Sequence, residues 1–165
     1  MSRMQLQQLK AQARSVLAGL DFLGGWLPPL ALRLLLAFEF WTSGVEKLQG
    51  SNWFSEIQDR FPFPLNLVPT EISWHLATWF ELIGPLALVL GLATRFFAVS
   101  LSILTVVAII SVHAGLGYNV CDSGWKLPVI YMVMFLPLIF SGPGKLSLDH
   151  WIRLKHMGGE RRLWS

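Results

Sequence analysis

Charged residues and cysteines are scarce in this chain. Only 14% of its 165 residues are charged, against about 25% in an average soluble domain. The single cysteine, Cys121, excludes an internal disulfide, CxxC redox chemistry and a cysteine-rich metal site within one chain. The sequence also has no Walker motif, no phosphate-binding glycine loop and no Ser-His-Asp or Cys-His signature. Nothing therefore indicates a nucleotide-dependent enzyme or a hydrolase.

Long apolar runs dominate instead, because 53% of the residues are hydrophobic and the mean hydropathy is +0.51. A helix crosses a bilayer core of about 30 Å with about 20 mostly apolar residues. Four apolar runs are present, and the fourth, near residues 127–140, is short, so it needs its polar neighbours to reach both membrane interfaces. We predict an all-α integral membrane protein whose transmembrane bundle, residues 26–142, has four spans. These spans cover about 26–48, 73–93, 95–117 and 125–141.

Both flanks of this bundle are amphipathic or basic. In residues 1–25, apolar residues recur at helical spacing, so we predict a helix over 3–22 that lies on the cytoplasmic membrane surface. Asp21 interrupts its apolar patch and no small-residue cleavage site follows, so we expect no cleaved signal peptide. Residues 143–165 form a basic cytoplasmic tail, for which we also predict an interfacial segment.

The positions of Lys and Arg predict the orientation of the bundle. With both termini cytoplasmic, nine basic residues flank the spans inside and three, Lys47, Arg60 and Lys126, lie outside. Lys and Arg accumulate on the cytoplasmic side of membranes, so we predict that both termini are cytoplasmic. The net charge of +3 and the pI near 9.4 suit anionic lipid headgroups. We therefore expect a lipid bilayer, and no nucleic acid, as a partner.

Proline and short connections shape the loops. In the first outer loop, residues 49–73, three prolines follow a stretch that can form a short interfacial helix, so we expect the loop to fold back as a cap on the bundle. Between the second and third spans only Thr94 and Arg95 remain for a turn, which predicts an antiparallel hairpin.

Ionisable residues inside membrane spans are costly, and each is a hypothesis about function. Glu39, Ser43, Glu46 and Lys47 recur at helical spacing, which places them on one face of the first span. That face should point into the bundle or a wet cavity. The six ionisable candidates are Arg33, Glu39, Glu46, His75, Glu81 and His113.

Glu39 and Glu81 are the candidate catalytic residues, because both lie at similar depth near the middle of their spans. They can form a proton relay or the polar wall of a quinone pocket; alternatively, each makes an interhelical hydrogen bond or salt bridge that pins the bundle. A nearby Arg33 can keep one of them ionised. Pro85 lacks the N–H that would bond to the carbonyl of residue 81, so we expect a kink and a free carbonyl there.

His75 and His113 fall at the outer side of the second and third spans. With nearby polar loop residues they form a candidate cluster for a metal or a quinone headgroup, although no two ligands have a recognisable metal spacing. The alternative is that each is a hydrogen-bonded interfacial histidine. A bis-histidine haem is a further alternative for this pair.

Three stretches resemble a known family. Arg33 opens the first span and Ser43-Gly-Val-Glu-Lys47 closes it. The other two are Glu81-Leu-Ile-Gly-Pro-Leu-Ala-Leu-Val-Leu-Gly-Leu-Ala-Thr-Arg95 and Gly142-Pro-Gly-Lys-Leu-Ser-Leu-Asp149. Their order and spacing resemble the DoxX family of small bacterial membrane proteins. The resemblance implies a four-helix bundle in the bacterial inner membrane, and relatives include a small subunit of archaeal thiosulfate:quinone oxidoreductase.

The resemblance also implies functional residues, among which Arg95 and Asp149 both fall on the cytoplasmic face. We expect a structural salt bridge between those two. The residues that carry over are Arg33, Lys47, Glu81, Arg95 and Asp149.

These observations leave three hypotheses about function. The first is an accessory subunit of a quinone-linked membrane redox system, in which Glu81 and Glu39 handle protons, Lys47 or His75 polarises a quinone headgroup, and Arg33 completes the site. The second is a non-catalytic scaffold or assembly factor. The third is a small transporter or metal-handling protein, for which a homodimer is the more plausible form.

Overall fold

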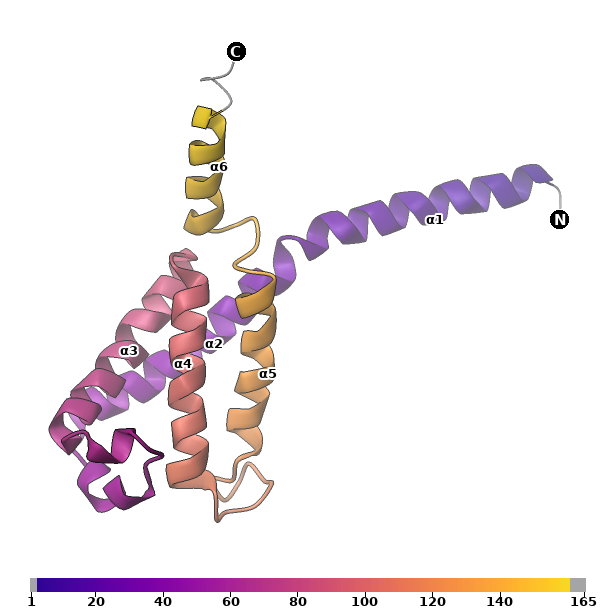
Figure 1. The fold of residues 1–165 in the computed structure, drawn as a ribbon. Coiled ribbons are helices and arrows are strands. Elements are labelled where there is room, and N and C mark those ends of the chain that lie inside the picture. Colours follow the sequence, from indigo (N-terminus) through magenta and orange to yellow (C-terminus); the bar gives the residue numbers. More distant parts are fainter. Residues whose placement is uncertain (1–2, 161–165) are drawn as a thin grey trace.

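The computed structural model describes residues 3–160, and in this part of the chain it contains helices and turns but no strand. The tail residues Arg161 and Arg162, which we placed in the cytoplasm, lie outside the described residues. The main helices are α1 (Arg3–Gly24), α2 (Leu27–Gln49), α3 (Thr70–Leu90), α4 (Thr94–Ala108), α5 (Lys126–Phe140) and α6 (Leu148–Glu160). Helices α2 to α5 form the bundle, α1 extends away from it as an arm, and α6 continues beyond one end (Figure 1).

The helices confirm the predicted fold class, an all-α protein with several helices long and apolar enough to span a membrane. Helix α3 and the pair formed by α4 and the π-helical turn η4 (Ile109–His113) are each long and apolar enough to span a membrane, as is the segment that contains α2. Helix α5 has 15 residues, which at 1.5 Å each gives about 22 Å. As expected for the fourth run, α5 alone is shorter than a bilayer core.

Apolar side chains cover both the inside and the outside of the bundle. The core is built from buried residues of all four helices: Leu36, Ala37, Phe40, Leu88, Ala98, Leu101, Phe135 and Leu138. Large apolar side chains on the outer faces are exposed, for example Leu34, Leu86, Val99 and Val133. A soluble protein rarely exposes so continuous an apolar surface, whereas lipid covers it without penalty. The structure is a helical membrane bundle.

Helices α2 and α3 approach each other closely at Gly44. A Cβ atom there would lie 2.8 Å from the backbone oxygen of Glu81, so only glycine fits. That oxygen is the carbonyl that Pro85 leaves without its usual helical donor, and α3 nevertheless continues as one helix through Pro85. The small residue and the proline together bring the backbone of Glu81 against α2.

We call the end of the bundle where α2 and α4 begin the terminal end, because α1 and α6 connect there, and the opposite end the loop end. At the loop end, residues 50–69 fold into three short 3₁₀ turns, η1 (Phe54–Glu56), η2 (Gln58–Arg60) and η3 (Leu65–Leu67). Phe54 packs edge-on against Trp74 of α3, and the Ser111 hydroxyl donates to the Arg60 carbonyl at 3.3 Å. The expected cap is therefore confirmed.

At the terminal end, Asp149 binds the start of α4. Its two carboxylate oxygens accept the backbone N–H groups of Ala93 and Thr94 at 2.8 and 2.9 Å. The predicted salt bridge between Arg95 and Asp149 is wrong: these N–H groups occupy the carboxylate, and Arg95 donates to the Phe140 carbonyl at 3.3 Å. The turn itself is formed by Gly91 to Ala93, and Thr94 is already the first residue of α4.

Arg33 also belongs to the terminal end. Its side chain is 1% exposed, and Nη2 donates to the Leu146 carbonyl at 2.7 Å. The hypothesis that Arg33 keeps Glu39 or Glu81 ionised is wrong, because Glu39 lies six residues, or about 9 Å, further along the helix, and Glu81 pairs with Lys47 instead. Within residues 3–160, Arg33 binds a backbone carbonyl of the segment that follows α5 and not a carboxylate of the bundle.

Candidate functional site

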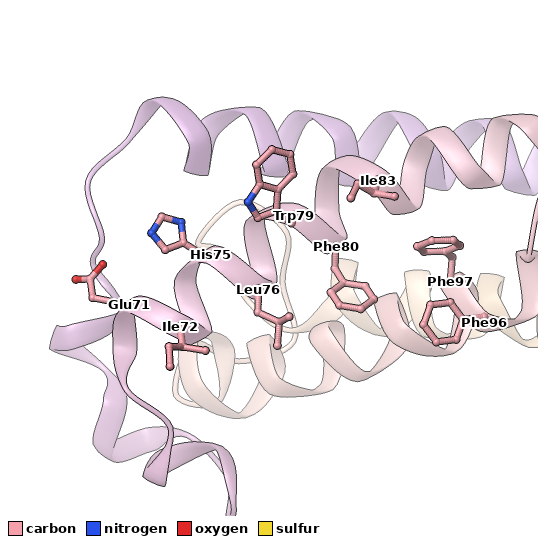
Figure 2. A pocket seen from close by; sticks show the side chains of 9 residues that line it. All are labelled: Glu71, Ile72, His75, Leu76, Trp79, Phe80, Ile83, Phe96 and Phe97. Atoms are coloured by element: carbon pink, nitrogen blue, oxygen red, sulfur yellow. The ribbon is translucent and has the colours of Figure 1, made fainter.

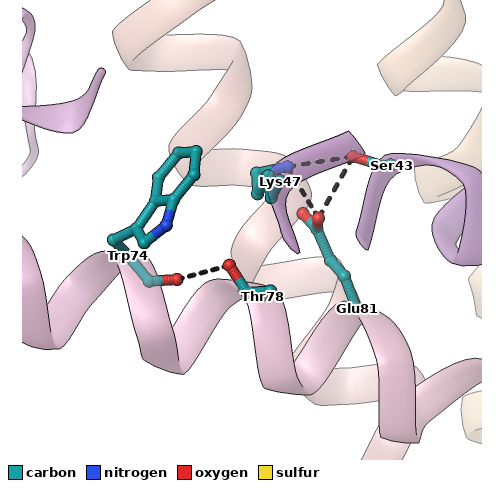
Figure 3. Close-up of polar contacts among 5 residues, drawn as sticks. All are labelled: Ser43, Lys47, Trp74, Thr78 and Glu81. Atoms are coloured by element: carbon teal, nitrogen blue, oxygen red, sulfur yellow. Dashed lines mark hydrogen bonds and ion pairs between the residues drawn. The ribbon is translucent and has the colours of Figure 1, made fainter. Parts of the chain in front are cut away.

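An ion pair joins α2 to α3 in the half of the bundle nearer the loop end. Lys47 Nζ donates to Glu81 Oε2 at 2.6 Å and to the Ser43 hydroxyl at 2.9 Å, and that hydroxyl donates to the same Oε2 at 3.1 Å (Figure 3). The Lys47 and Glu81 side chains are only 14% and 10% exposed. Of the residues described, these two form the only salt bridge.

The sequence explains this geometry. Ser43 and Lys47 are four residues apart and therefore lie one above the other on one helix face. The close approach at Gly44 brings α3 within reach of both. Attraction between charges strengthens away from water, but leaving either charge alone there is costly. The Ser43 hydroxyl satisfies part of the remaining hydrogen-bonding capacity of the pair.

Glu39 makes a second polar contact between helices. The Tyr131 hydroxyl of α5 donates to Glu39 Oε2 at 2.6 Å. Glu39 lies one turn before Ser43 on the same face of α2, so this helix carries polar contacts to both α3 and α5. The prediction of a shared face pointing into the bundle is confirmed for Glu39, Ser43 and Lys47, whereas Glu46 is exposed. Glu39 and Glu81 each have their own partner and do not face each other.

A cavity of about 830 Å³ lies beside both contacts. It is within the range of about 300–1,000 Å³ typical of small-molecule sites. Side chains from α2, α3, α4 and α5 form its wall, and its aromatic members are Phe38, Phe40, Trp53, Trp74 and Tyr131. Its ionisable members are Glu39, Glu46, Lys47, Glu81 and His113. A few polar groups thus converge on a largely apolar space.

A second cavity, of about 270 Å³, lies on the other side of the ion pair. Its wall comes from the capping loop, including Phe61 and Leu65, and from α3 and α4. Lys47 and Glu81 line both cavities. The ion pair therefore borders both cavities, of which the larger carries more ionisable residues.

Comparison with known proteins identifies the family. The DoxX family model matches residues 29–114. The chain belongs to the DoxX family. It is 57% identical to an uncharacterised protein of Haemophilus influenzae over 131 residues, which are 79% of this chain and 87% of that relative. A second uncharacterised protein of the same organism is 37% identical over 73 residues, 42% of this chain and 54% of its own length. No solved structure matches.

The DoxX match contains most of the candidate site. Ser43, Lys47 and Glu81 lie inside the matched residues 29–114, and so does Glu39. Tyr131, which binds Glu39, lies outside them. Helices α2 and α3, which carry the ion pair, therefore belong to the part of the chain that defines the family.

The two candidate histidines do not form one cluster. His113 lines the larger cavity, where its Nδ1 contacts the Ser123 carbonyl. His75 lies in a separate, largely apolar groove of about 590 Å³ on the outside of α3 and α4, with Trp79 and Phe80 (Figure 2). Among residues 3–160, no three His, Cys, Asp or Glu side chains come together as potential metal ligands. The predicted outer cluster is not assembled.

Tyr131 is the site residue that the sequence analysis missed. Its signal was present, since it is the one polar aromatic residue inside the apolar run of the fourth span. A tyrosine hydroxyl buried in lipid needs a partner, and a carboxylate at similar depth on another span is the obvious one. Glu39 and Glu81 both meet this criterion, and the structure assigns Tyr131 to Glu39.

Proposed function

We propose that this DoxX-family membrane protein binds a quinone in the larger cavity and acts as an accessory subunit of a membrane redox system. The observation that carries the proposal is the Lys47–Glu81 pair in the wall of an aromatic-lined cavity of about 830 Å³. A flat, largely apolar ring with polar oxygens matches such a wall: aromatic side chains contact the ring and a few donors orient the oxygens.

The polar groups have complementary roles in this proposal. Lys47 has three N–H donors, and two of them already serve Glu81 and Ser43. The third is free to donate to a quinone carbonyl. Reduction to the hydroquinone takes up two electrons, from a partner oxidoreductase, and two protons. Glu81, and Glu39 with Tyr131, lie in the same wall and can pass protons to the two oxygens.

The smaller cavity suits the rest of such a molecule. It is lined mostly by apolar side chains of the capping loop, α3 and α4, including Phe61, Leu65 and Ile103. We place the first part of an isoprenoid tail there, with the headgroup on the polar side of the Lys47–Glu81 pair.

The binding test uses fluorescence. Trp53 and Trp74 line the larger cavity, so a short-chain quinone bound there should quench tryptophan emission in the protein purified in mild detergent, saturably. Glu81→Gln should weaken this quenching at least about tenfold. Glu56→Gln is the matched control, because it makes the same chemical change on an exposed side chain at the loop end. Equal quenching in both variants, or no saturation in the unchanged protein, would contradict quinone binding.

The topology belongs to the same proposal. We place the protein in the bacterial inner membrane with both termini in the cytoplasm, because nine basic residues then lie inside and three outside. The larger cavity would open toward the outer half of the membrane. Reporter fusions at both termini test this, and signals from opposite sides of the membrane would overturn it.

A second candidate function has its own supporting observation. Both polar contacts join different helices, α2 to α3 and α2 to α5, as expected of a scaffold whose polar residues only pin its helices. A scaffold predicts that Glu81→Gln lowers thermal stability, that no quinone is extracted from the purified protein, and that a partner protein co-purifies with it.

A further inference from the structure

A small basic pocket lies at the terminal end of the bundle, far along α2 from the polar cavity. Its volume is about 190 Å³, and its lining residues are Gly25, Ser141, Pro143, Gly144, Lys145, His150 and Arg153. Three of these seven side chains are basic and none is acidic. A cavity below about 300 Å³ is too small for a drug-sized molecule, so it suits a small anionic group.

The backbone fixes the shape of this basic pocket. The N–H of Lys145 donates to the Gly25 carbonyl at 3.1 Å, which ties the tail to the start of the bundle. Gly144 has a φ of +81°, and a Cβ there would lie 2.8 Å from Pro29 Cβ. The Ser147 hydroxyl donates to the Gly144 carbonyl at 2.8 Å and accepts the N–H of His150 at 3.1 Å. The pocket is therefore built before any ligand arrives.

Its basic side chains form no ion pair with the described part of the protein. Across residues 3–160, neither Lys145 nor Arg153 has an ion-pair partner. Asp149 is the nearest acidic residue in the sequence, and its carboxylate is held by the N–H groups of Ala93 and Thr94. The Lys145 ammonium lies 5.6 Å over the ring of Phe22. The pocket thus keeps its positive charge for an external anion.

The surroundings of the pocket place it at a membrane interface. Phe22 packs against Trp26 beside it, and aromatic residues of this kind gather at the headgroup level of membranes. Helix α1 leaves the bundle and α6 continues from it at this same end (Figure 1). Both helices expose large apolar side chains, namely Val16, Leu17, Leu20, Phe22, Leu23, Trp151, Ile152 and Leu154.

We infer that this pocket binds the phosphate of an anionic phospholipid, whose acyl chains lie along the exposed apolar side chains of α1 and α6. Lys145 and Arg153 supply the charge that pairs with the phosphate, and His150 and Ser141 supply further hydrogen-bond donors. The apolar surface beside the pocket favours a lipid over free phosphate, because a lipid covers both features at once. This inference is independent of the quinone proposal, since the two sites share no residue.

The test measures lipid bound to the full-length protein by native mass spectrometry in a neutral detergent. Short-chain phosphatidylglycerol is the probe, and short-chain phosphatidylcholine and inorganic phosphate are the comparison ligands. Phosphatidylglycerol should bind at one saturable site. The double variant Lys145→Gln/Arg153→Gln should bind it roughly 25-fold more weakly, because each Lys or Arg near an anionic headgroup contributes about a factor of five.

The control is the double variant Lys10→Gln/Arg14→Gln. It removes the same charge from exposed positions of α1 and should bind phosphatidylglycerol within about twofold of the unchanged protein. Equal losses in both variants would overturn the inference in favour of diffuse electrostatics. Two further measurements use the unchanged protein. If phosphatidylcholine bound as tightly as phosphatidylglycerol, the pocket would not select an anionic lipid. If millimolar inorganic phosphate displaced the lipid, the ligand would be phosphate rather than a phospholipid.

Discussion

The two ends of the bundle use charged residues differently. At the loop end, Lys47 and Glu81 bond to side chains and line two cavities. At the terminal end, Arg33 and Asp149 bond to backbone groups of the tail and of the α3–α4 turn, and Arg33 is almost fully buried. The charges of Arg33 and Asp149 close the fold at the terminal end, whereas those of Lys47 and Glu81 face a space that a ligand can enter.

This difference separates structural from functional roles within one set of residues. The resemblance to DoxX proteins singled out Arg33, Lys47, Glu81, Arg95 and Asp149 together. The structure divides them: Lys47 and Glu81 reach the candidate cavity, and the other three hold the terminal end. Substitutions of Arg33, Arg95 or Asp149 should therefore reduce stability alone, and those of Lys47 or Glu81 should also reduce quinone binding.

The largest expected effect is at Gly91, in the turn of the terminal end. Its φ is +66°, and a Cβ there would lie 2.1 Å from Arg33 Nη1 and 2.4 Å from the Ser147 side chain. Backbone strain and overpacking together predict that Gly91→Ala lowers the free energy of unfolding by about 3 to 5 kcal/mol. Titration of the purified protein with a denaturing detergent measures this.

Gly115→Ala is the matched control for that experiment, because nothing lies within 4 Å of its added Cβ. It should change stability by less than about 0.5 kcal/mol. If Gly91→Ala proved as stable as Gly115→Ala, the close packing of Arg33 against the turn would be wrong.

The next largest effect concerns the Lys47–Glu81 pair and separates pinning from binding. Lys47→Met leaves Glu81 without its partner and should lower stability by about 2 to 3 kcal/mol, less than for a fully buried pair because both side chains are partly exposed. The double variant Lys47→Met/Glu81→Met should recover most of that loss, since two apolar groups replace two charges.

Quinone binding gives the second measurement on the same variants. The double variant should stay folded and yet lose the fluorescence quenching, because its donor and acceptor are gone. A stable double variant that still binds quinone would remove this pair from the binding site. A double variant as unstable as the single one would mean that the helices cannot repack, contrary to the expected compensation.

A smaller effect is expected at Asp149. Asp149→Asn keeps one acceptor oxygen but loses the charge and one of the two bonds to the start of α4, so stability should fall by about 1 to 2 kcal/mol. Quinone binding should not change. Asp122→Asn, in an exposed loop, is the control. Loss of quinone binding in Asp149→Asn at unchanged stability would contradict the division between the two ends.

The sequence predicted the spans and the shared face of α2 because both depend on local periodicity. Apolar runs of sufficient length and the spacing of Glu39, Ser43 and Lys47 are visible in the chain itself. Which partner each of these residues binds depends on how the helices rotate and approach one another. Gly44 permits the close approach, and the sequence shows this glycine without showing that it meets the backbone of Glu81.

The terminal end was harder to predict because its bonds use backbone groups. Matching charges suggested that Arg95 pairs with Asp149, but the free N–H groups at the start of a helix compete for a carboxylate. The positive φ of Gly91 and Ala93 turns these N–H groups toward the tail. The identity of the side chains alone does not show that backbone N–H groups compete with Arg95 for the Asp149 carboxylate.

The smallest effect is expected at Tyr131, where binding and structure are most easily separated. Tyr131→Phe removes one hydroxyl and its 2.6 Å bond to Glu39 while keeping the ring that packs against Phe40. Stability should fall by about 1 kcal/mol, the usual net contribution of one hydrogen bond, because water in the adjacent cavity can replace the hydroxyl as a donor to Glu39. Because Glu39 then loses its partner in the cavity wall, quinone affinity should fall about two- to fivefold, less than in Glu81→Gln. Tyr118→Phe, on the exposed loop, should change neither quantity. A larger loss of affinity in Tyr131→Phe than in Glu81→Gln would move the centre of the site from the contact between α2 and α3 to the contact between α2 and α5.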